Sequence, residues 1–191
     1  MRALLKRILM KDKTITREYL EDESEVLFKI IPELKDEDGF AQRNPWHIYD
    51  VWRHTEVALS HSNHDFETRL ALLLHDIGKP HCFQEDENGV RHFAGHAQES
   101  ARMVVPILER LGFIESEIDS IVWLVANHST PIDVSKVNKG NLAKYKKLLH
   151  IQACDCMAYN PIYVAKGLAK LEPVAAKLKE IEKGDNKRED R

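Results

Sequence analysis

The chain of 191 residues lacks the long apolar run that crosses a membrane, because no stretch approaches the roughly 18 residues that a spanning helix needs. Its first residues, MRALLKRILMKDKTI, carry too many charges for the apolar core of a secretion signal. Its three cysteines form no CxxC pair, and a chain of this length needs no disulfide framework to fold. We therefore expect a protein that is neither exported nor inserted in a membrane, in a reducing, cytoplasmic compartment.

A strong excess of one charge is also missing, since 28 Lys and Arg stand against 31 Asp and Glu, with a formal net charge of -3. This balance does not favour a protein that wraps nucleic acid over a large surface. Residues 136–147, KVNKGNLAKYKK, are locally basic, and we interpret them mainly as a solvated helix face. The sequence contains no GxSxG, GxxxxGK[ST] or GxGxxG motif, so a serine nucleophile, a P-loop and a dinucleotide fold have no support.

No long stretch alternates apolar and polar residues as a β-strand would, whereas apolar residues recur with helical spacing over most of the chain. The pattern predicts an all-α protein with one compact domain over residues 1–183, followed by a disordered tail over residues 184–191. The predicted helices cover residues 2–11, 16–31, 50–62, 65–76, 96–111, 116–128, 140–160 and 162–183. We expect Gly78 to adopt a left-handed conformation after the fourth helix, and Ser116 with Asp119 to form a capping box.

Histidine and aspartate occupy positions that should face inward on several predicted helices. His54, His75 and His128 fall on the apolar sides of three helices. Asp76 follows the apolar run LALLL, and Asp155 lies on an otherwise apolar stripe, where an unpaired carboxylate is costly to bury. A single inward histidine is most often a core residue with a hydrogen bond, but several such residues together indicate a bound divalent metal.

His96, at the start of its helix, completes a set of four imidazoles and two carboxylates. The predicted ligands are His54, His75, Asp76, His96, His128 and Asp155. The set suffices for two metals of about five to six ligands each once water is added, with one carboxylate shared. A zinc finger is not supported, because the nearest thiols, Cys154 and Cys156, have CxC spacing. The ligand types fit Mn, Fe, Co, Ni, Zn or Mg and do not choose among them.

The order H…HD…H…H…D, read over about residues 47–160, resembles the HD superfamily of metal-dependent phosphohydrolases, a family of helix bundles. Four segments are similar to the HD domain of bacterial CCA-adding tRNA nucleotidyltransferases and poly(A) polymerases. They are NPWHIYDVWRHT, LLHDIGKP, GHAQESA and HIQACDCMAYNP. Those enzymes carry an upstream nucleotidyltransferase head with paired aspartates, and the residues before Trp46 show no such motif. We therefore expect the hydrolytic module alone, without nucleotide addition.

The resemblance implies how the six ligands are shared between two metals. One metal would be held by His54, His75, Asp76 and Asp155, and the other by Asp76, His96 and His128, with Asp76 bridging them. The metals would activate a water that attacks phosphorus. A single metal, with His96 and His128 contacting substrate instead, stays an alternative.

Four residues near the ligands are candidates for contact with substrate. Lys79 lies just past a helix end, where it could meet a substrate phosphate, and we assign it with Asp76 to the catalytic residues. A solvated lysine at a helix C-terminus is the alternative for Lys79. Gln42, His47 and Arg53, which lead into the first ligand helix, are weaker candidates.

The sequence therefore predicts a metal-dependent phosphohydrolase that cleaves a phosphate ester, with a nucleotide such as a 2′,3′-cyclic or mononucleotide phosphate as the expected substrate class. Phosphodiesterase, nucleotidase and phosphatase activities are all compatible with it. The alternatives are a di-iron oxygenase of the HD type, a metal-containing module that binds RNA or nucleotides, and a purely structural helical domain. The exact substrate, the identity of the metal and the oligomeric state are not predicted.

Overall fold

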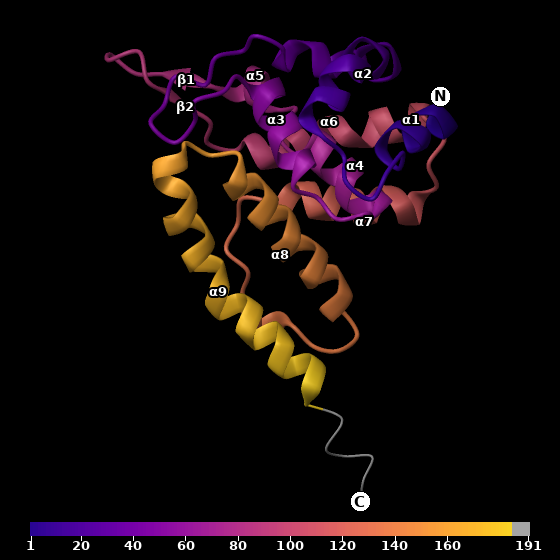
Figure 1. Cartoon of the computed structure of the whole chain (residues 1–191), viewed down its shortest axis with the longest axis vertical. Helices are drawn as coiled ribbons and strands as arrows, with labels where there is room; N and C mark the ends of the chain where they lie inside the picture. Colours follow the sequence, from indigo (N-terminus) through magenta and orange to yellow (C-terminus); the bar gives the residue numbers. More distant parts are fainter. Residues whose placement is uncertain (185–191) are drawn as a thin grey trace, which may run out of the picture.

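The computed structural model describes residues 1–184 as α-helices joined by short connections, with one small β-hairpin (Figure 1). The α-helices are α1 (Arg2–Leu9), α2 (Arg17–Ile30), α3 (Val51–Ser60), α4 (Phe66–Leu74), α5 (Lys79–Cys82), α6 (His96–Arg110), α7 (Glu115–Asn127), α8 (Leu142–Met157) and α9 (Pro161–Lys183). Two 3₁₀ helices, η1 (Pro32–Glu37) and η2 (Val134–Lys136), accompany them. The predicted all-α class is confirmed.

The predicted boundaries need a few corrections. The hairpin, in which β1 (Gln84–Glu85) pairs with β2 (Arg91–His92) in antiparallel register, lies between the predicted helices 65–76 and 96–111, and the all-α prediction contains no such strands. The extent of the predicted domain, residues 1–183, stays a prediction. Residues 185–191 of the predicted tail lie outside the described residues.

Helix α4 is the centre of the core, because it packs against α1, α3, α7 and α8. Every residue from Thr68 to Leu74 is buried, as expected of a helix that is apolar on nearly all sides. Each fully buried leucine in it stabilises the fold by roughly 1.5–3 kcal/mol. The buried guanidinium of Arg69 donates to the carbonyl oxygens of Leu9, Asp12 and Lys13, which ties α4 to the end of α1.

The start of α3, the first helix of the site, is fixed by a side-chain cap. Asp50 accepts a hydrogen bond from the Arg53 backbone at 2.7 Å, which confirms it as the N-cap of α3. Helix α7 starts differently from the prediction. Its cap is Ile114, whose backbone nitrogen donates to the Glu117 carboxylate at 3.1 Å, so the expected capping box is wrong.

Gly78 does not adopt the left-handed conformation that was predicted, and glycine is needed there for lack of space instead. Its φ is -82° and its ψ is -14°, so it is right-handed. A Cβ at this position would lie 2.5 Å from the Ser100 nitrogen and 2.9 Å from the His96 oxygen. Its own nitrogen donates to Ser100 Oγ at 2.9 Å. The glycine therefore allows the turn after α4 to lie against the first turns of α6.

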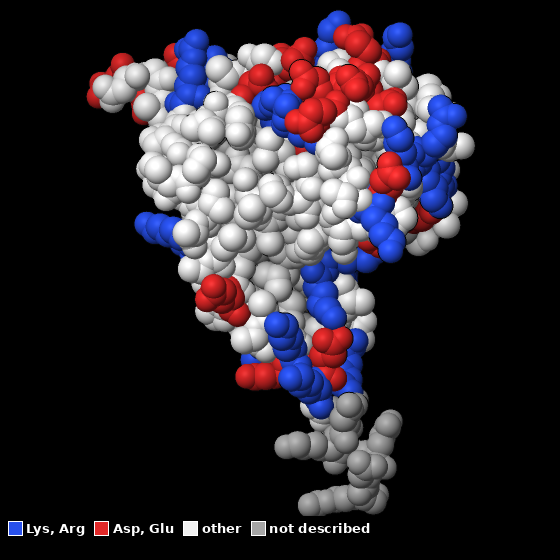
Figure 2. All heavy atoms as spheres, in the orientation of Figure 1, with Lys and Arg blue, Asp and Glu red and all other residues white. Residues whose placement is uncertain are grey.

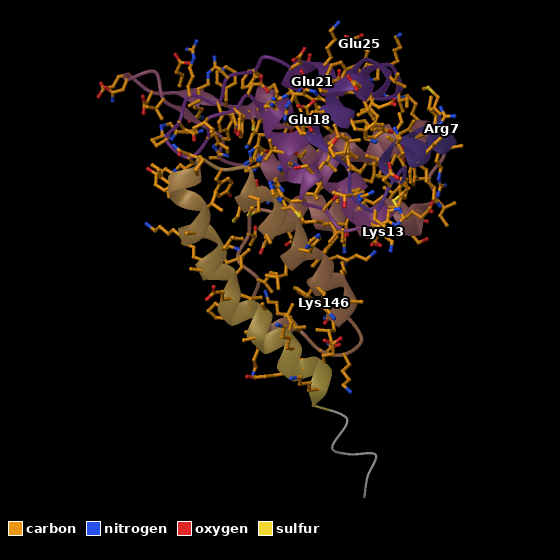
Figure 3. All side chains as sticks on the ribbon, viewed as in Figure 1. Arg7, Lys13, Glu18, Glu21, Glu25 and Lys146 are labelled. Atoms are coloured by element: carbon orange, nitrogen blue, oxygen red, sulfur yellow. The ribbon has the colours of Figure 1, made fainter. Side chains whose placement is uncertain are left out.

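Helices α8 and α9 pack side by side and extend away from the rest of the bundle (Figure 1). Near their far ends, Lys146 of α8, labelled in Figure 3, pairs with Glu182 of α9 at 2.8 Å. Figure 2 shows that a broad face with few charges separates this end from the acidic surface of α2. Within residues 1–184, no helix combines the length and apolar character needed to cross a membrane.

Candidate metal centre

The six predicted ligands converge at one buried point between five helices. His54 comes from α3, His75 and Asp76 from the turn after α4, His96 from the first residue of α6, His128 from the end of α7 and Asp155 from α8. We call these six residues the His/Asp cluster. All are buried except His96, whose side chain is 18% exposed. Side chains far apart in sequence therefore meet where a single ion could contact several of them.

Asp76 lies between two pairs of imidazoles. Its Oδ2 is 3.5 Å from His54 Nε2 and 3.2 Å from His75 Nε2. Its Oδ1 is 3.4 Å from His96 Nε2 and 3.6 Å from His128 Nε2. The two oxygens of one carboxylate thus face two different sets of nitrogen atoms, the arrangement that a bridging ligand requires.

Asp155 completes one side of the cluster. Its Oδ1 is 2.8 Å from His54 Nε2 and 3.7 Å from His75 Nε2. One group of three residues within metal-binding reach is therefore His54, His75 and Asp155, and a second is His75, Asp76 and His128.

Each imidazole of the cluster is oriented by a backbone carbonyl. The Nδ1 atoms of His54, His75, His96 and His128 lie 3.2, 2.7, 2.8 and 2.7 Å from the oxygens of Ala158, Leu72, Phe93 and Val125, respectively. Because a carbonyl oxygen can only accept, each Nδ1 carries the proton and donates it. All four Nε2 atoms then point into the cluster, which is the arrangement by which proteins fix metal-ligating histidines.

The positions of His75 and His128 relative to helix ends explain their hydrogen bonds to backbone carbonyls. His75 and His128 each follow the last residue of a helix, α4 and α7. The final carbonyls of a helix have no intrahelical partner. Leu72 and Val125, three residues earlier, present such carbonyls to the rings. Placing a histidine directly after a helix end therefore both caps the helix and turns Nε2 inward.

The cluster contains buried polar atoms that the described residues leave without a hydrogen bond. These atoms are His75 Nε2 and Asp76 Oδ1, whereas Asp76 Oδ2 forms an ion pair with Lys79 at 2.6 Å. In addition, His96 Nε2 and His128 Nε2 lie 3.1 Å apart although both rings carry their proton on Nδ1. Unpaired buried groups of this kind are costly, and a cation between them would compensate every one. The donors are imidazole nitrogens and carboxylate oxygens without thiolate, a set that suits a divalent metal.

The charges of the cluster are strongly coupled. Burial would raise the pKa of Asp76, but the charges of His75 and Lys79 hold it well below its usual range. Burial likewise opposes ionisation of Asp155, but His54 and His75 hold its pKa well below the usual range. Although burial lowers the pKa of His75, the two carboxylates raise it to about 10. Both carboxylates are therefore anionic and attract a cation.

Lys79 lies at the edge of the cluster. Its side chain is 5% exposed, and its Nζ lies 2.6 Å from Asp76 Oδ2 and 2.8 Å from Gln42 Oε1. An ammonium carries three protons, so one donor position remains beyond these two contacts. Gln42 is buried and donates to the Tyr49 carbonyl at 3.3 Å, and thus lies behind Lys79 rather than on the cavity wall.

His47 and Arg53 have different surroundings. His47 lines the cavity above the cluster, and its Nδ1 lies 2.8 Å from Asn44 Oδ1. Burial, together with the charge of Lys79, lowers the pKa of His47 to about 2, so its ring is neutral. Arg53 instead pairs with Glu21, labelled on α2 in Figure 3, and with Glu56. The structure does not bring Arg53 to the cluster.

Tyr159 is a site residue that sequence reasoning missed. Its Oη donates to Asp155 Oδ2 at 3.0 Å, and the negative charge of Asp155, together with burial, raises the pKa of the phenol. A signal existed, since Tyr159 follows Asp155 by four residues, one helical turn. The hydrogen bond occupies one oxygen of Asp155 and directs the other toward His54.

A cavity of about 430 Å³ opens onto the cluster. Its walls include Trp46, Lys79, Phe93 and Arg91, the last from β2 of the hairpin. Its size lies within the range of small-molecule sites, roughly 300–1,000 Å³. A small substrate can therefore reach the cluster from solvent.

The basic stretch at residues 136–147 is largely neutralised by its neighbours. Lys136 pairs with Asp133 at 3.6 Å and Lys146 with Glu182 at 2.8 Å. Lys147 lies 3.1 Å from an oxygen of Asp65 and also pairs with Glu67. Lys144 lies over the Trp123 ring at 3.9 Å. These contacts favour a structural surface over a nucleic-acid interface.

Buried imidazoles and carboxylates at the base of an open cavity form a site that could hold a divalent metal. The family model described as "HD domain" matches residues 47–159. The chain belongs to the HD domain family, within the superfamily of metal-dependent phosphohydrolases, whose members typically bind divalent metals. The resemblance to the HD superfamily that was noted in the sequence is confirmed.

Two curated relatives are tRNA nucleotidyltransferases. The chain is 35% identical over 104 residues to an A-adding tRNA nucleotidyltransferase of Deinococcus radiodurans, across 51% of this chain and 24% of the relative. It is 31% identical over 130 residues to a CC-adding tRNA nucleotidyltransferase of Thermus thermophilus, across 65% of this chain and 30% of the relative. The chain thus spans less than a third of the length of these relatives.

Proposed function

We propose that the protein is a metal-dependent phosphohydrolase that cleaves the phosphate ester of a nucleotide, as a 2′,3′-cyclic phosphodiesterase, a nucleotidase or a phosphatase. The observation that carries the proposal is Asp76, a buried carboxylate whose two oxygens face two pairs of inward-pointing Nε2 atoms. Membership of the HD domain family supports hydrolysis, and the names of the tRNA-modifying relatives support a nucleotide.

The residues present fit two divalent metals. His54, His75, Asp76 and Asp155 would hold one, and the second would be held by Asp76 with two further histidines, His96 and His128. When bound, such ions lower the pKa of water and neutralise the charge that develops on phosphoryl oxygens.

The chain's own groups prepare the site for an anionic ester. The carbonyl oxygens that accept from Nδ1 fix all four rings before substrate arrives, so no reorganisation is needed. The ammonium of Lys79 partly neutralises Asp76 and keeps one proton for a phosphate oxygen. Neutral His47 on the cavity wall can accept or donate a hydrogen bond without adding charge.

The proposal is tested with purified protein and a panel of phosphate esters that includes glycerol 2-phosphate, nucleoside monophosphates and 2′,3′-cyclic nucleotides, each assayed with Mn²⁺, Mg²⁺, Co²⁺, Ni²⁺ and Fe²⁺. We expect metal-dependent turnover that Asp76→Asn lowers by about a thousand-fold or more. Asp22→Asn, which changes an exposed carboxylate of α2, is the matched control and should retain full activity. Circular dichroism should show the same helical content in all three proteins.

Two outcomes would contradict the proposal. Turnover that survives in Asp76→Asn would remove Asp76 from the chemistry. Iron-dependent oxygen uptake without hydrolysis of any ester would favour the di-iron oxygenase instead.

A further inference from the structure

The cavity above the cluster has a second lobe. A neighbouring cavity of about 280 Å³ shares five wall residues with the first. The shared residues are Trp46, His128, Ser129, Asp155 and Tyr159. Because His128 and Asp155 belong to the His/Asp cluster, the two lobes meet at the point where chemistry would occur. A substrate with its phosphate at the cluster can therefore extend from there into the second lobe, which runs between α8, α9 and the loop after α7.

An aromatic platform forms one wall of the second lobe. The rings of Trp46 and Tyr163 lie 4.3 Å apart between centroids, at an interplanar angle of 39°. Trp46 is 43% exposed, and its carbonyl oxygen accepts a hydrogen bond of 2.7 Å from the Asn160 nitrogen at the α8–α9 turn. A fixed, exposed tryptophan next to a phosphate site is a surface on which a nucleobase can stack.

Two lysines supply positive charge to the same lobe. Lys166 and Lys170 lie one helical turn apart on α9 and line the second lobe. Neither forms an ion pair with any residue from 1 to 184, in contrast to Lys177 of the same helix, which pairs with Glu180 at 2.8 Å. Among the described residues that line this lobe, Asp155 is the sole carboxylate. Apart from the cluster, this lobe is therefore cationic and suited to an anion.

Gly167 holds α9 in the position that places these lysines over the lobe. A Cβ on Gly167 would lie 3.0 Å from Cys156 Sγ and 3.9 Å from the Tyr159 ring. The glycine thus lets α9 approach α8 directly beside the site. The position of the two lysines follows from a close helix contact rather than from a flexible loop.

We propose that the substrate is a nucleoside that carries two phosphates, one at the His/Asp cluster and the other at Lys166 and Lys170, with its base against Trp46 and Tyr163. This inference rests on the proposed function. Water adds across the P–O bond of the first phosphate, which leaves as inorganic phosphate, and the nucleoside oxygen takes up the proton. The second phosphate stays attached and serves only in binding. The end of an oligonucleotide and a free nucleoside bisphosphate both have this chemistry.

Steady-state kinetics on the metal-loaded protein test the inference. The substrates are adenosine 3′,5′-bisphosphate, adenosine 3′-phosphate, adenosine 5′-phosphate, a triadenylate with a 3′-terminal phosphate, and glycerol 2-phosphate. For the wild type, we expect kcat/KM to be about tenfold or more higher for the bisphosphate and the triadenylate than for the monophosphates, through a lower KM. The better of the bisphosphate and the triadenylate then identifies the source of the second phosphate.

The double variant Lys166→Ala/Lys170→Ala should abolish this advantage by raising KM, while its kcat and its turnover of glycerol 2-phosphate stay at the wild-type level. The matched control, Lys177→Ala/Lys179→Ala, removes two charges farther along α9 that line neither lobe and should change nothing. Trp46→Ala should raise KM by a larger factor for every adenosine substrate than for glycerol 2-phosphate, which has no base to stack.

The failures of the two proposals are distinguishable. If the wild type hydrolyses glycerol 2-phosphate and the monophosphates as efficiently as the bisphosphate and the triadenylate, the second lobe binds no phosphate and this inference is overturned. An advantage that persists in the double variant overturns it as well. If no ester at all is hydrolysed, the proposed function fails first and this inference fails with it.

Discussion

At the scale of single residues, one hydrogen bond at Nδ1 decides which way the Nε2 atom of each cluster histidine points. Histidine offers two nitrogens, and the one that faces a metal is decided by the hydrogen bond of the other. Here three of the four rings donate to the carbonyl three residues earlier, as in His75 to Leu72, His96 to Phe93 and His128 to Val125. The ring orientation is therefore encoded locally, next to each histidine.

Tyr159 extends this support to a carboxylate. Tyr159→Phe removes the hydrogen bond to Asp155 without changing the packing of the ring. Because outer partners of metal ligands typically contribute 10–100-fold to metal affinity, we expect about that loss in Mn²⁺ affinity by calorimetric titration. Tyr145→Phe, on α8 and with its ring against Trp123, should leave the affinity unchanged. Equal affinities in all three proteins would show that Asp155 needs no such partner.

Glu56, which lies outside the His/Asp cluster, should make the stability of the folded protein depend on pH. It is 2% exposed, one of its oxygens lacks a hydrogen bond from the described residues, and burial raises its pKa to about 7 despite Arg53. Its folded pKa is raised above the unfolded value, so the native state binds more protons and stability falls as pH rises from about 4.5 to 7. The full loss is about 3 kcal/mol.

Glu56→Gln should therefore gain stability over the wild type at pH 8 and gain little at pH 4.5, measured by urea unfolding at both values. Glu25→Gln, at an exposed position of α2, is the control and should behave like the wild type. A gain that is the same at both pH values would show that the carboxylate is already ionised at low pH.

Five residues of the His/Asp cluster could be singled out from the sequence because each is a polar residue on, or at the end of, an apolar helix face. His96 was added as the residue at a helix start that completes the set. The neighbours of the cluster carry no such signal. Lys79 contacts Gln42 and Arg53 contacts Glu21, in both cases across more than 30 positions of the chain. Which cation faces the cavity and which is neutralised on the surface depends on those distant partners, so the sequence alone could not separate the two.

At the scale of elements, the site depends on a sharp turn between a buried helix and its neighbour. Helix α4 fixes the position of the turn, and α6 packs against it through Gly78 and Ser100. The existence of most helices was predictable because their apolar periodicity is strong. The backbone conformation of Gly78 and the first residue of α7 were not predictable, since each is decided by a contact that forms only in the folded chain.

Gly78→Ala should damage both the fold and the cluster. The added Cβ meets backbone atoms of α6 at 2.5 and 2.9 Å, and backbone cannot move aside as a side chain can. We expect a loss of about 1–3 kcal/mol in the free energy of unfolding, measured in urea, together with weaker Mn²⁺ binding. Gly140→Ala, whose Cβ would meet only the Asn138 side chain at 3.2 Å, should be close to neutral. A stable Gly78→Ala protein with normal metal affinity would refute this account of the turn.

At the scale of the whole molecule, the cluster exists only when the chain is folded. His54 and Asp155, 2.8 Å apart in space, are separated by 101 positions in sequence. An unfolded chain cannot present these ligands together, so metal binding adds to the stability of the native state.

Mn²⁺ should accordingly raise the melting temperature. At a free concentration of 100 times the dissociation constant, one site adds about 2.7 kcal/mol, which for a chain of this size is roughly 5–10 °C in Tm. Differential scanning fluorimetry with and without a chelator measures the shift. The Asp155→Asn variant should lose most of this shift in Tm, whereas Asp133→Asn, at the exposed N-cap of η2, should keep it. A wild-type Tm that no divalent metal changes would count against the site.

The most direct measurement is the metal content of protein purified without chelators, determined by elemental analysis beside the Asp76→Asn variant. We predict about two divalent ions per wild-type chain and a loss of both when the bridging carboxylate is replaced, with the helical content unchanged. A wild type that contains no metal after exposure to Mn²⁺, Fe²⁺, Co²⁺, Ni²⁺, Zn²⁺ and Mg²⁺ would contradict the account. So would an Asp76→Asn protein that keeps both ions.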